Sequence, residues 1–118
     1  MSTRSAIIMK DGDGYKGVYC HSDGYLSWNG KILLENYQDE NKVRELIGLG
    51  DLSILRPELD STTAYARDRG EVLNVAVGPT IKSVAKQIAH NGYVYVFENG
   101  GWHINGEVLT KEMINEDN

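Results

Sequence analysis

The chain has 118 residues, of which 41% are hydrophobic and 25% are charged, and its formal net charge is −5. This size and composition predict a single folded domain over residues 1–118 and exclude a chain that is disordered throughout. The acidic balance argues against general nucleic-acid binding, which needs a clustered Lys/Arg surface, although it is compatible with a local basic pocket.

Cysteine use and hydropathy bear on where the protein works. Cys20 is the only cysteine, which rules out an internal disulfide and suits a reducing cytoplasm. The N-terminal residues lack an apolar run of signal-peptide length, and no run approaches the ~20 residues that a membrane-spanning helix needs. We therefore expect a cytoplasmic protein that does not bind membranes.

The N-terminal residues predict a β-hairpin. Residues 5–10, SAIIMK, form a short apolar run that is typical of a central strand. Residues 11–14, DGDG, are dense in turn formers, because Gly tolerates a positive φ and Asp bonds back to its own backbone. Residues 15–21 then alternate in polarity, as a half-buried strand does, and place Tyr19 and His21 on one face.

Two helices are predicted next. Residues 27–37 have a helical pattern, although Gly30 weakens the first turn. Residues 39–50 form the second, with Asp39 as its N-cap. This helix carries an apolar stripe at spacings of three and four, formed by Val43, Leu46 and Ile47.

The middle of the chain has weaker periodicity. Residues 50–63 read as irregular, with one 3₁₀ turn near Leu52 and Leu55. Residues 63–66 predict a short strand that leads into the sequence RDRGE. The sequence of residues 72–78, VLNVAVG, does not indicate which type of secondary structure they form.

The last third predicts a helix and a hairpin. Residues 79–92 form the helix, with Pro in its first turn and Gly at its end. Residues 93–97 and 102–104 flank Asn99-Gly100, which is a strong hairpin signal. Residues 105–106, again Asn-Gly, predict one further turn.

These elements predict an α+β domain, because strands lie near both ends of the chain and helices lie between them. We expect a mainly antiparallel sheet with two or three helices packed on one face. The polar, acidic tail at residues 110–118 is expected to be frayed.

The acidic and histidine residues do not predict a metal site. The DGDG stretch begins like a calcium loop, but its fifth position is Tyr15, where an EF-hand needs an acidic or amide side chain. His21, His90 and His103 lack the spacing of zinc ligands, and the single cysteine has no second cysteine beside it. We therefore expect neither a metal nor another cofactor.

HSDGY, at residues 21–25, is the first stretch with functional potential. It lies where a strand ends and a helix is about to begin, so His21, Asp23 and Tyr25 are expected around one opening. If Asp23 orients the imidazole of His21, the pair suits acid–base chemistry. The alternative is a strand-end histidine followed by an Asx-type turn. Cys20 and His21 are neighbours on a strand, so they point to opposite faces and form no catalytic dyad.

AYARDRGE, at residues 64–71, is the second such stretch. Arg67 and Arg69 carry planar guanidinium groups that suit a carboxylate or phosphate, and Tyr65 adds a ring. One interpretation is an anion clamp in which Asp68 fixes one guanidinium and leaves the other free. The other is an internal cluster of salt bridges to acidic residues of the helices. The sequence leaves both open.

Five segments carry a resemblance to a known family, namely TRSAII (3–8), YCHSDGY (19–25), GKILLENY (30–37), KVRELIGLGDLSIL (42–55) and AYARDRGE (64–71). With them the chain resembles a family of small proteins, encoded mainly by bacteriophages and prophages, that share TRS, HxDGY and RDRGE motifs. The closing YVYVFENGGWHING is similar to that family's usual ending. The resemblance implies an accessory protein in the cytoplasm of an infected or lysogenic bacterium, and accessory proteins of this size often counter host defence.

These observations predict a binding protein that captures a small anionic, nucleotide-derived ligand between tyrosine rings and arginine side chains. One alternative is an inhibitor that presents an acidic surface to a host protein. Another, ranked last, is a small hydrolase that uses His21 with Asp23. We also expect a homodimer, because small binding domains often build pockets between symmetric copies. The predicted ligand-binding residues are Arg4, His21, Asp23, Tyr25, Tyr65, Arg67, Asp68, Arg69 and Glu71.

Overall fold

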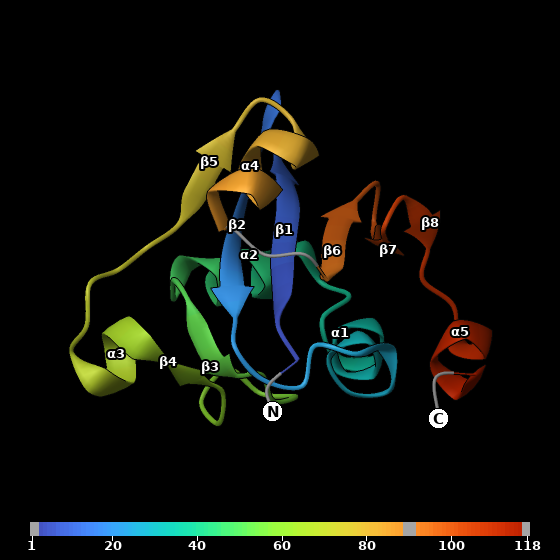
Figure 1. The fold of residues 1–118 in the computed structure, drawn as a ribbon, viewed down its shortest axis with the longest axis horizontal. Helices are drawn as coiled ribbons and strands as arrows, with labels where there is room; N and C mark the ends of the chain where they lie inside the picture. Colours follow the sequence, from blue (N-terminus) through green and yellow to red (C-terminus); the bar gives the residue numbers. More distant parts are fainter. Residues whose placement is uncertain (1–2, 89–91, 117–118) are drawn as a thin grey trace.

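The computed structural model describes residues 3–88 and 92–116 of the chain. Within them the chain forms one mixed sheet and five α-helices, the first preceded by a short π-helical turn (Figure 1). The strands are β1 (Ser5–Asp11), β2 (Gly14–Cys20), β3 (Leu52–Ile54), β4 (Thr63–Ala64), β5 (Ala76–Gly78), β6 (Tyr93–Glu98), β7 (Gly101–Ile104) and β8 (Glu107–Val108). The helical elements are η1 (Leu26–Gly30), α1 (Lys31–Asn36), α2 (Glu40–Gly48), α3 (Tyr65–Arg69), α4 (Ile81–Ile88) and α5 (Lys111–Glu116).

Strand β1 lies at the centre of the sheet. The strand order is β4-β3-β2-β1-β6-β7-β8, and β5 also pairs with β2. The β1–β6 and β2–β3 pairs are parallel, and the other five pairs are antiparallel. The predicted α+β class with a mainly antiparallel sheet is therefore confirmed.

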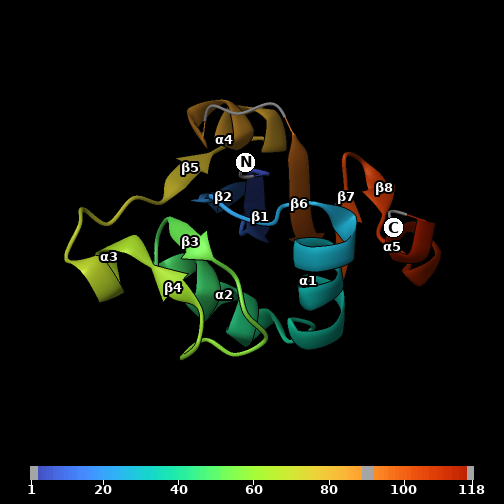
Figure 2. The same cartoon turned by 60° about the horizontal axis from the view of Figure 1, so that its bottom comes forward.

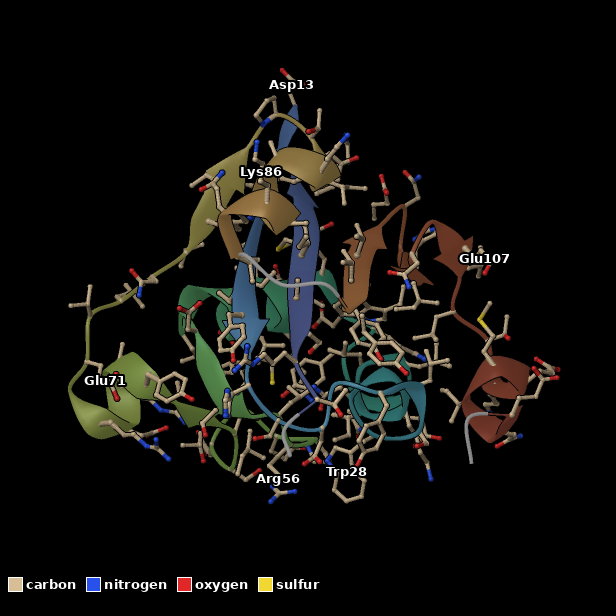
Figure 3. The ribbon with its side chains drawn as sticks, in the orientation of Figure 1. Asp13, Trp28, Arg56, Glu71, Lys86 and Glu107 are labelled. Atoms are coloured by element: carbon tan, nitrogen blue, oxygen red, sulfur yellow. The ribbon has the colours of Figure 1, made fainter. Side chains whose placement is uncertain are left out.

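The predicted hairpins are present. Strands β1 and β2 pair from Ser5 opposite Cys20 to Asp11 opposite Gly14, so that two residues form the turn. Asn99 and Gly100, between β6 and β7, have φ angles of 54° and 76°. Positive φ at both central residues matches the right-handed twist of the flanking strands. The β1–β2 turn, marked by Asp13, and the π-helical turn, marked by Trp28, lie at opposite ends of the molecule (Figure 3).

The two faces of β1 pack against different helices. Ile7 and Met9 belong to the larger core with residues of α1 and α2, whereas Ala6 and Ile8 pack with Val84 of α4. Figure 2 shows α4 on one side of β1 and β2, with α1 and α2 on the other. The first two predicted helices thus share one face, and the third covers the opposite face. Because β1 is apolar at each of these positions, both of its faces need a cover.

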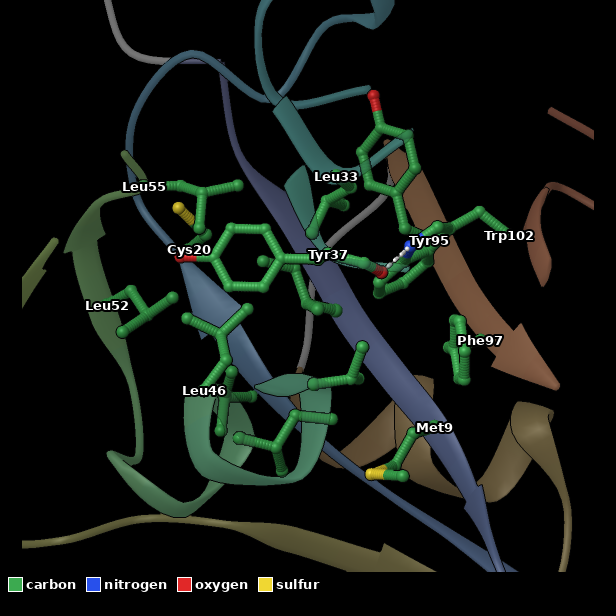
Figure 4. Packing of buried hydrophobic residues seen from close by; sticks show 14 of the residues in the cluster. Met9, Cys20, Leu33, Tyr37, Leu46, Leu52, Leu55, Tyr95, Phe97 and Trp102 are labelled. Atoms are coloured by element: carbon green, nitrogen blue, oxygen red, sulfur yellow. Dashed lines mark hydrogen bonds between the residues drawn. The ribbon is translucent and has the colours of Figure 1, made fainter. Parts of the chain in front are cut away.

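The larger core is organised around three aromatic residues that also carry hydrogen bonds (Figure 4). The indole Nε1 of Trp102 donates to the carbonyl oxygen of Tyr37 at 2.7 Å. The Tyr37 hydroxyl donates to the carbonyl oxygen of Arg56 at 2.8 Å, and that of Tyr95 donates to the carbonyl oxygen of Gly24 at 2.7 Å. Buried Tyr and Trp side chains need such partners for their polar atoms. These bonds tie the end of α1 to β7 and to the loop after β3.

Cys20 is a core residue, and its burial raises the pKa of its thiol to about 11. Because the thiolate is the nucleophile, we expect iodoacetamide at pH 8 to alkylate the folded protein roughly 100-fold more slowly than the unfolded chain. Mass spectrometry of time points taken in native buffer and in urea measures the two rates. Equal rates in the two conditions would contradict this prediction.

The irregular segment predicted over residues 50–63 contains a short strand instead. Leu52 of β3 pairs with Cys20 of β2 on one side and with Ala64 of β4 on the other. Leu52 and Leu55 are fully buried. Both pairing partners come from other parts of the chain, so the local pattern of a three-residue strand does not reveal it.

The strand predicted over residues 63–66 ends at Ala64, and Tyr65–Arg69 form helix α3. A carboxylate oxygen of Asp68 accepts a hydrogen bond from the Ala64 N–H at 2.8 Å. It thereby satisfies a donor that the start of a helix leaves without an intrahelical partner. Gly70, with a φ of 67°, ends the helix in the left-handed conformation that glycine favours.

The tail predicted to be frayed over residues 110–118 contains helix α5. The Thr110 hydroxyl accepts a hydrogen bond from the Met113 N–H at 3.3 Å and so caps the first turn. Ile114 is buried in the larger core, which holds the helix against the domain. Residues 117–118 lie outside the described residues, as do residues 89–91 of the third predicted helix.

Candidate ligand-binding site

A cavity of about 540 Å³ opens beside the C-terminal half of β2. Its walls come from the start of the chain, from β2, from the segment that leads into β5 and from the end of α4. The polar residues that line it are Arg4, Tyr19, Asp51, Asn74 and Gln87. Segments far apart in the sequence therefore build one hollow.

Tyr19 connects this cavity to both predicted motifs. Its hydroxyl is hydrogen-bonded to Nδ1 of His21 at 2.6 Å, which links it to HSDGY. It also interacts electrostatically with Tyr65, the residue that opens α3, and with Arg4. Burial raises the pKa of the Tyr19 hydroxyl above its usual value, and the charge of Arg4 offsets part of that effect. The link to His21 is a direct hydrogen bond, whereas the links to Tyr65 and Arg4 are electrostatic.

Arg4, which lines the cavity, and Arg69, on α3, are available to bind an anion. Within residues 3–88 and 92–116, neither Arg4 nor Arg69 is paired with a carboxylate. The guanidinium carbon of Arg69 lies 5.2 Å from the centre of the Tyr65 ring, in the geometry of a cation–π contact. Arg69 is therefore held against Tyr65, and neither residue is among those that line the cavity.

Arg67 behaves differently from Arg69. Its Nε donates to a carboxylate oxygen of Asp68 at 2.9 Å, its Nη1 donates to the carbonyl oxygen of Leu59 at 3.1 Å, and its Nη2 donates to that of Thr62. The hydrogen bond from Arg67 lowers the pKa of the Asp68 carboxyl group below its usual value. Asp68 therefore fixes one guanidinium and leaves the other unpaired, as the clamp interpretation requires. The pairing is local and does not reach the acidic residues of α1 or α2.

The central residues of HSDGY position the backbone. Gly24 lies so close to the preceding segment that an added Cβ would be 2.7 Å from the carbonyl oxygen of Arg4. Asp23 has a φ of 57°, its carboxylate accepts a hydrogen bond from the Tyr25 hydroxyl at 3.2 Å, and its carbonyl oxygen accepts one from the Asn29 N–H. These contacts hold the N-terminal segment, and Arg4 with it, against the turn.

The predicted orientation of His21 by Asp23 is not found in the described part of the chain. Nδ1 of His21 is bonded to Tyr19, and the Asp23 carboxylate is bonded to Tyr25. His21 therefore bonds to the cavity residue Tyr19 without lining the cavity itself, and Asp23 and Tyr25 lie in the turn. Glu71 lies on the exposed segment beside α3, where its N–H donates to the carbonyl oxygen of Tyr65 (Figure 3).

The sequence motifs left out four of the polar cavity residues. The strand alternation places Tyr19 on the same face as the predicted residue His21, but Tyr19 itself was not predicted to bind the ligand. The other three residues are Asp51, in the loop before β3, Asn74, in the segment before β5, and Gln87, on α4. They are far apart in the sequence, so no spacing pattern connects them.

Comparisons with family models, curated proteins and solved structures found no match to this chain. No helix of the described residues is long and apolar enough to cross a membrane. Among the same residues, no three His, Cys, Asp or Glu side chains are grouped to hold a metal ion.

Proposed function

We propose that the protein captures a small anionic, nucleotide-derived ligand in the cavity beside Tyr19. The observation that carries the proposal is the unpaired guanidinium of Arg4 at the rim of a cavity of about 540 Å³ that Tyr19 also lines. Cavities of ~300–1,000 Å³ are the usual size of small-molecule sites. Tyrosine rings and arginine forks together suit a ligand that has a flat base and a phosphate.

Each residue has a role that follows from its chemistry. Arg4 supplies donors for a phosphate, and Arg69, behind Tyr65, supplies a second cation. Tyr19 offers a ring face and a hydroxyl that is already oriented by His21. The amide side chain of Asn74 suits the polar edge of a base, because an amide both donates and accepts hydrogen bonds.

The biological setting in this proposal comes from the resemblance to bacteriophage and prophage proteins. A phage accessory protein that sequesters a nucleotide signal would counter a host defence that depends on that signal. Tight binding without turnover is enough for such a role.

Thermal-shift measurements with cyclic dinucleotides and ADP-ribose test the proposal, with adenosine and inorganic phosphate as control compounds. A ligand at 100 times its Kd stabilises the folded state by about 2.7 kcal/mol, which corresponds to a rise in Tm of roughly 10 °C for a domain of this size. We expect such a rise with at least one dinucleotide or ADP-ribose and less than ~2 °C with the controls. A folded protein whose Tm does not change with any of these nucleotides at millimolar concentration would contradict the proposal.

A further inference from the structure

Trp28, in the π-helical turn η1, is a partly exposed tryptophan. The chain has two tryptophans, and 42% of Trp28 is exposed, compared with 2% of Trp102. A single exposed apolar side chain is ordinary by itself, so its neighbours decide whether Trp28 could serve as a stacking surface. Figure 3 shows Trp28 beside Arg56 at the end of the molecule opposite Asp13.

The backbone of the π-helical turn determines where Trp28 points. The neighbouring Asn29 is fully buried, and its amide nitrogen donates to the Ser5 hydroxyl at 3.2 Å and to the Ser22 carbonyl oxygen at 3.1 Å. The Trp28 N–H donates to the Tyr25 carbonyl oxygen at 3.1 Å. With its neighbour anchored inward, Trp28 is held outward. π-Helical turns occur frequently at functional sites.

Arg56 faces the same hollow and is fixed at its backbone. Its N–H donates to the Thr62 hydroxyl oxygen at 2.9 Å, and its carbonyl oxygen accepts from the Tyr37 hydroxyl at 2.8 Å. Among the described residues no carboxylate pairs with its guanidinium. Because the backbone of Arg56 is fixed and its guanidinium is unpaired, an anion can bind there without ordering the loop.

The walls of this hollow are tied together by Lys42. Its Nζ donates to the carbonyl oxygens of Asn36 at 2.8 Å and Pro57 at 2.9 Å, and it lies 4.5 Å from the centre of the Tyr37 ring. The end of α1 is thereby fixed to the loop that carries Arg56. Between them lies a cavity of about 380 Å³, lined by Trp28, Lys31, Ile32, Glu35, Arg56 and Pro57.

We propose that this second cavity binds a mononucleotide, with the base stacked on Trp28 and the phosphate held by Arg56 and Lys31. A planar ring suits an exposed indole. Arg56 and Lys31 form no ion pair with a carboxylate of the described residues, so both cations suit a phosphate. Glu35, on the same wall, is placed to accept a hydrogen bond from a base amine or a ribose hydroxyl. None of the residues that line this cavity lines the one beside Tyr19, so the two sites are tested separately.

The indole N–H resonances in ¹H–¹⁵N NMR spectra test this site, because one exposed and one buried tryptophan give one reporter and one internal control. AMP is expected to shift the Trp28 resonance in a saturable way and to leave that of Trp102 unchanged. Adenosine and inorganic phosphate, which each lack one half of the ligand, are expected to bind at least ~10-fold more weakly, since each loses either the phosphate contacts or the stacking.

Variants separate this site from the one beside Tyr19. Arg56→Gln is expected to weaken AMP binding at least ~10-fold with no change in Tm, because only the unpaired tip of the side chain is altered. Arg44→Gln, which removes the same charge from α2 outside both cavities, is the matched control and should bind AMP at this site like the parent protein. The proposal is overturned if the Trp28 resonance does not move at millimolar AMP, if adenosine alone binds equally well, or if Arg56→Gln leaves the shift unchanged.

Discussion

Exchange of Arg4 for glutamine is expected to weaken binding of the stabilising nucleotide by about 10- to 100-fold, because a charge-assisted hydrogen bond to a phosphate contributes roughly 1.5–3 kcal/mol. The Arg4 side chain is exposed and unpaired in the described part of the chain. Its loss should therefore leave Tm within about 2 °C of the parent value. Isothermal titration calorimetry gives the affinity, and a thermal melt without ligand gives the stability.

The three arginines provide a matched set of variants for this prediction. Arg69→Gln should weaken binding in the same direction as Arg4→Gln. Arg67→Gln should instead lower stability and leave affinity unchanged. We expect its Tm to fall by roughly 2–5 °C, because the Arg67 guanidinium bonds to Asp68 and to two carbonyl oxygens. Unchanged affinity in Arg4→Gln, or a large loss of affinity in Arg67→Gln alone, would mean that the ligand binds elsewhere.

Replacement of Asn29 by alanine is expected to lower the free energy of unfolding by about 2–4 kcal/mol. Its amide nitrogen donates to the Ser5 hydroxyl and the Ser22 carbonyl oxygen and lies 3.5 Å from the sulfur of Cys20. Truncation would remove the donor to the Ser5 hydroxyl, would leave the Ser22 carbonyl oxygen with the weak Cys20 thiol donor, and would open a void in the core. Urea denaturation of the parent and the variant measures the difference.

Asn41→Ala is the control for Asn29→Ala, because Asn41 is exposed on α2. We expect a change of less than about 0.5 kcal/mol there. A loss below about 1 kcal/mol in Asn29→Ala would show that the turn between β2 and α1 does not depend on this residue. The positions of Trp28 and Gly24, on either side of that turn, would then need another explanation.

The elements that the sequence predicted well are those whose signals are local. The turn at residues 12–13, the Asn99-Gly100 turn and the second helix each have a short pattern with its own physical cause. In that helix, the side chain of Asp39 accepts a hydrogen bond from the Asn41 N–H, as an N-cap should. The elements that the sequence missed, β3 and α5, depend on pairing or packing with distant residues.

The candidate site could be predicted in part for the same reason. Arg67 and Arg69 are two residues apart, so a strand would have placed both on one face. Because Tyr65–Arg69 is a helix, the two side chains diverge, and one binds Asp68 while the other lies over Tyr65. The contributions of Asn74 and Gln87 depend on tertiary structure alone, and no pattern in the sequence reveals them.

The central claim is that a nucleotide binds in the cavity beside Tyr19, and a map of backbone amide shifts on ligand titration tests it most directly. We predict that the largest saturable shifts fall on Arg4, Tyr19, His21, Asp51, Tyr65 and Asn74, with a single Kd for all of them. If the same ligand raises Tm but the chemical shifts of these amides do not change, the claim is contradicted.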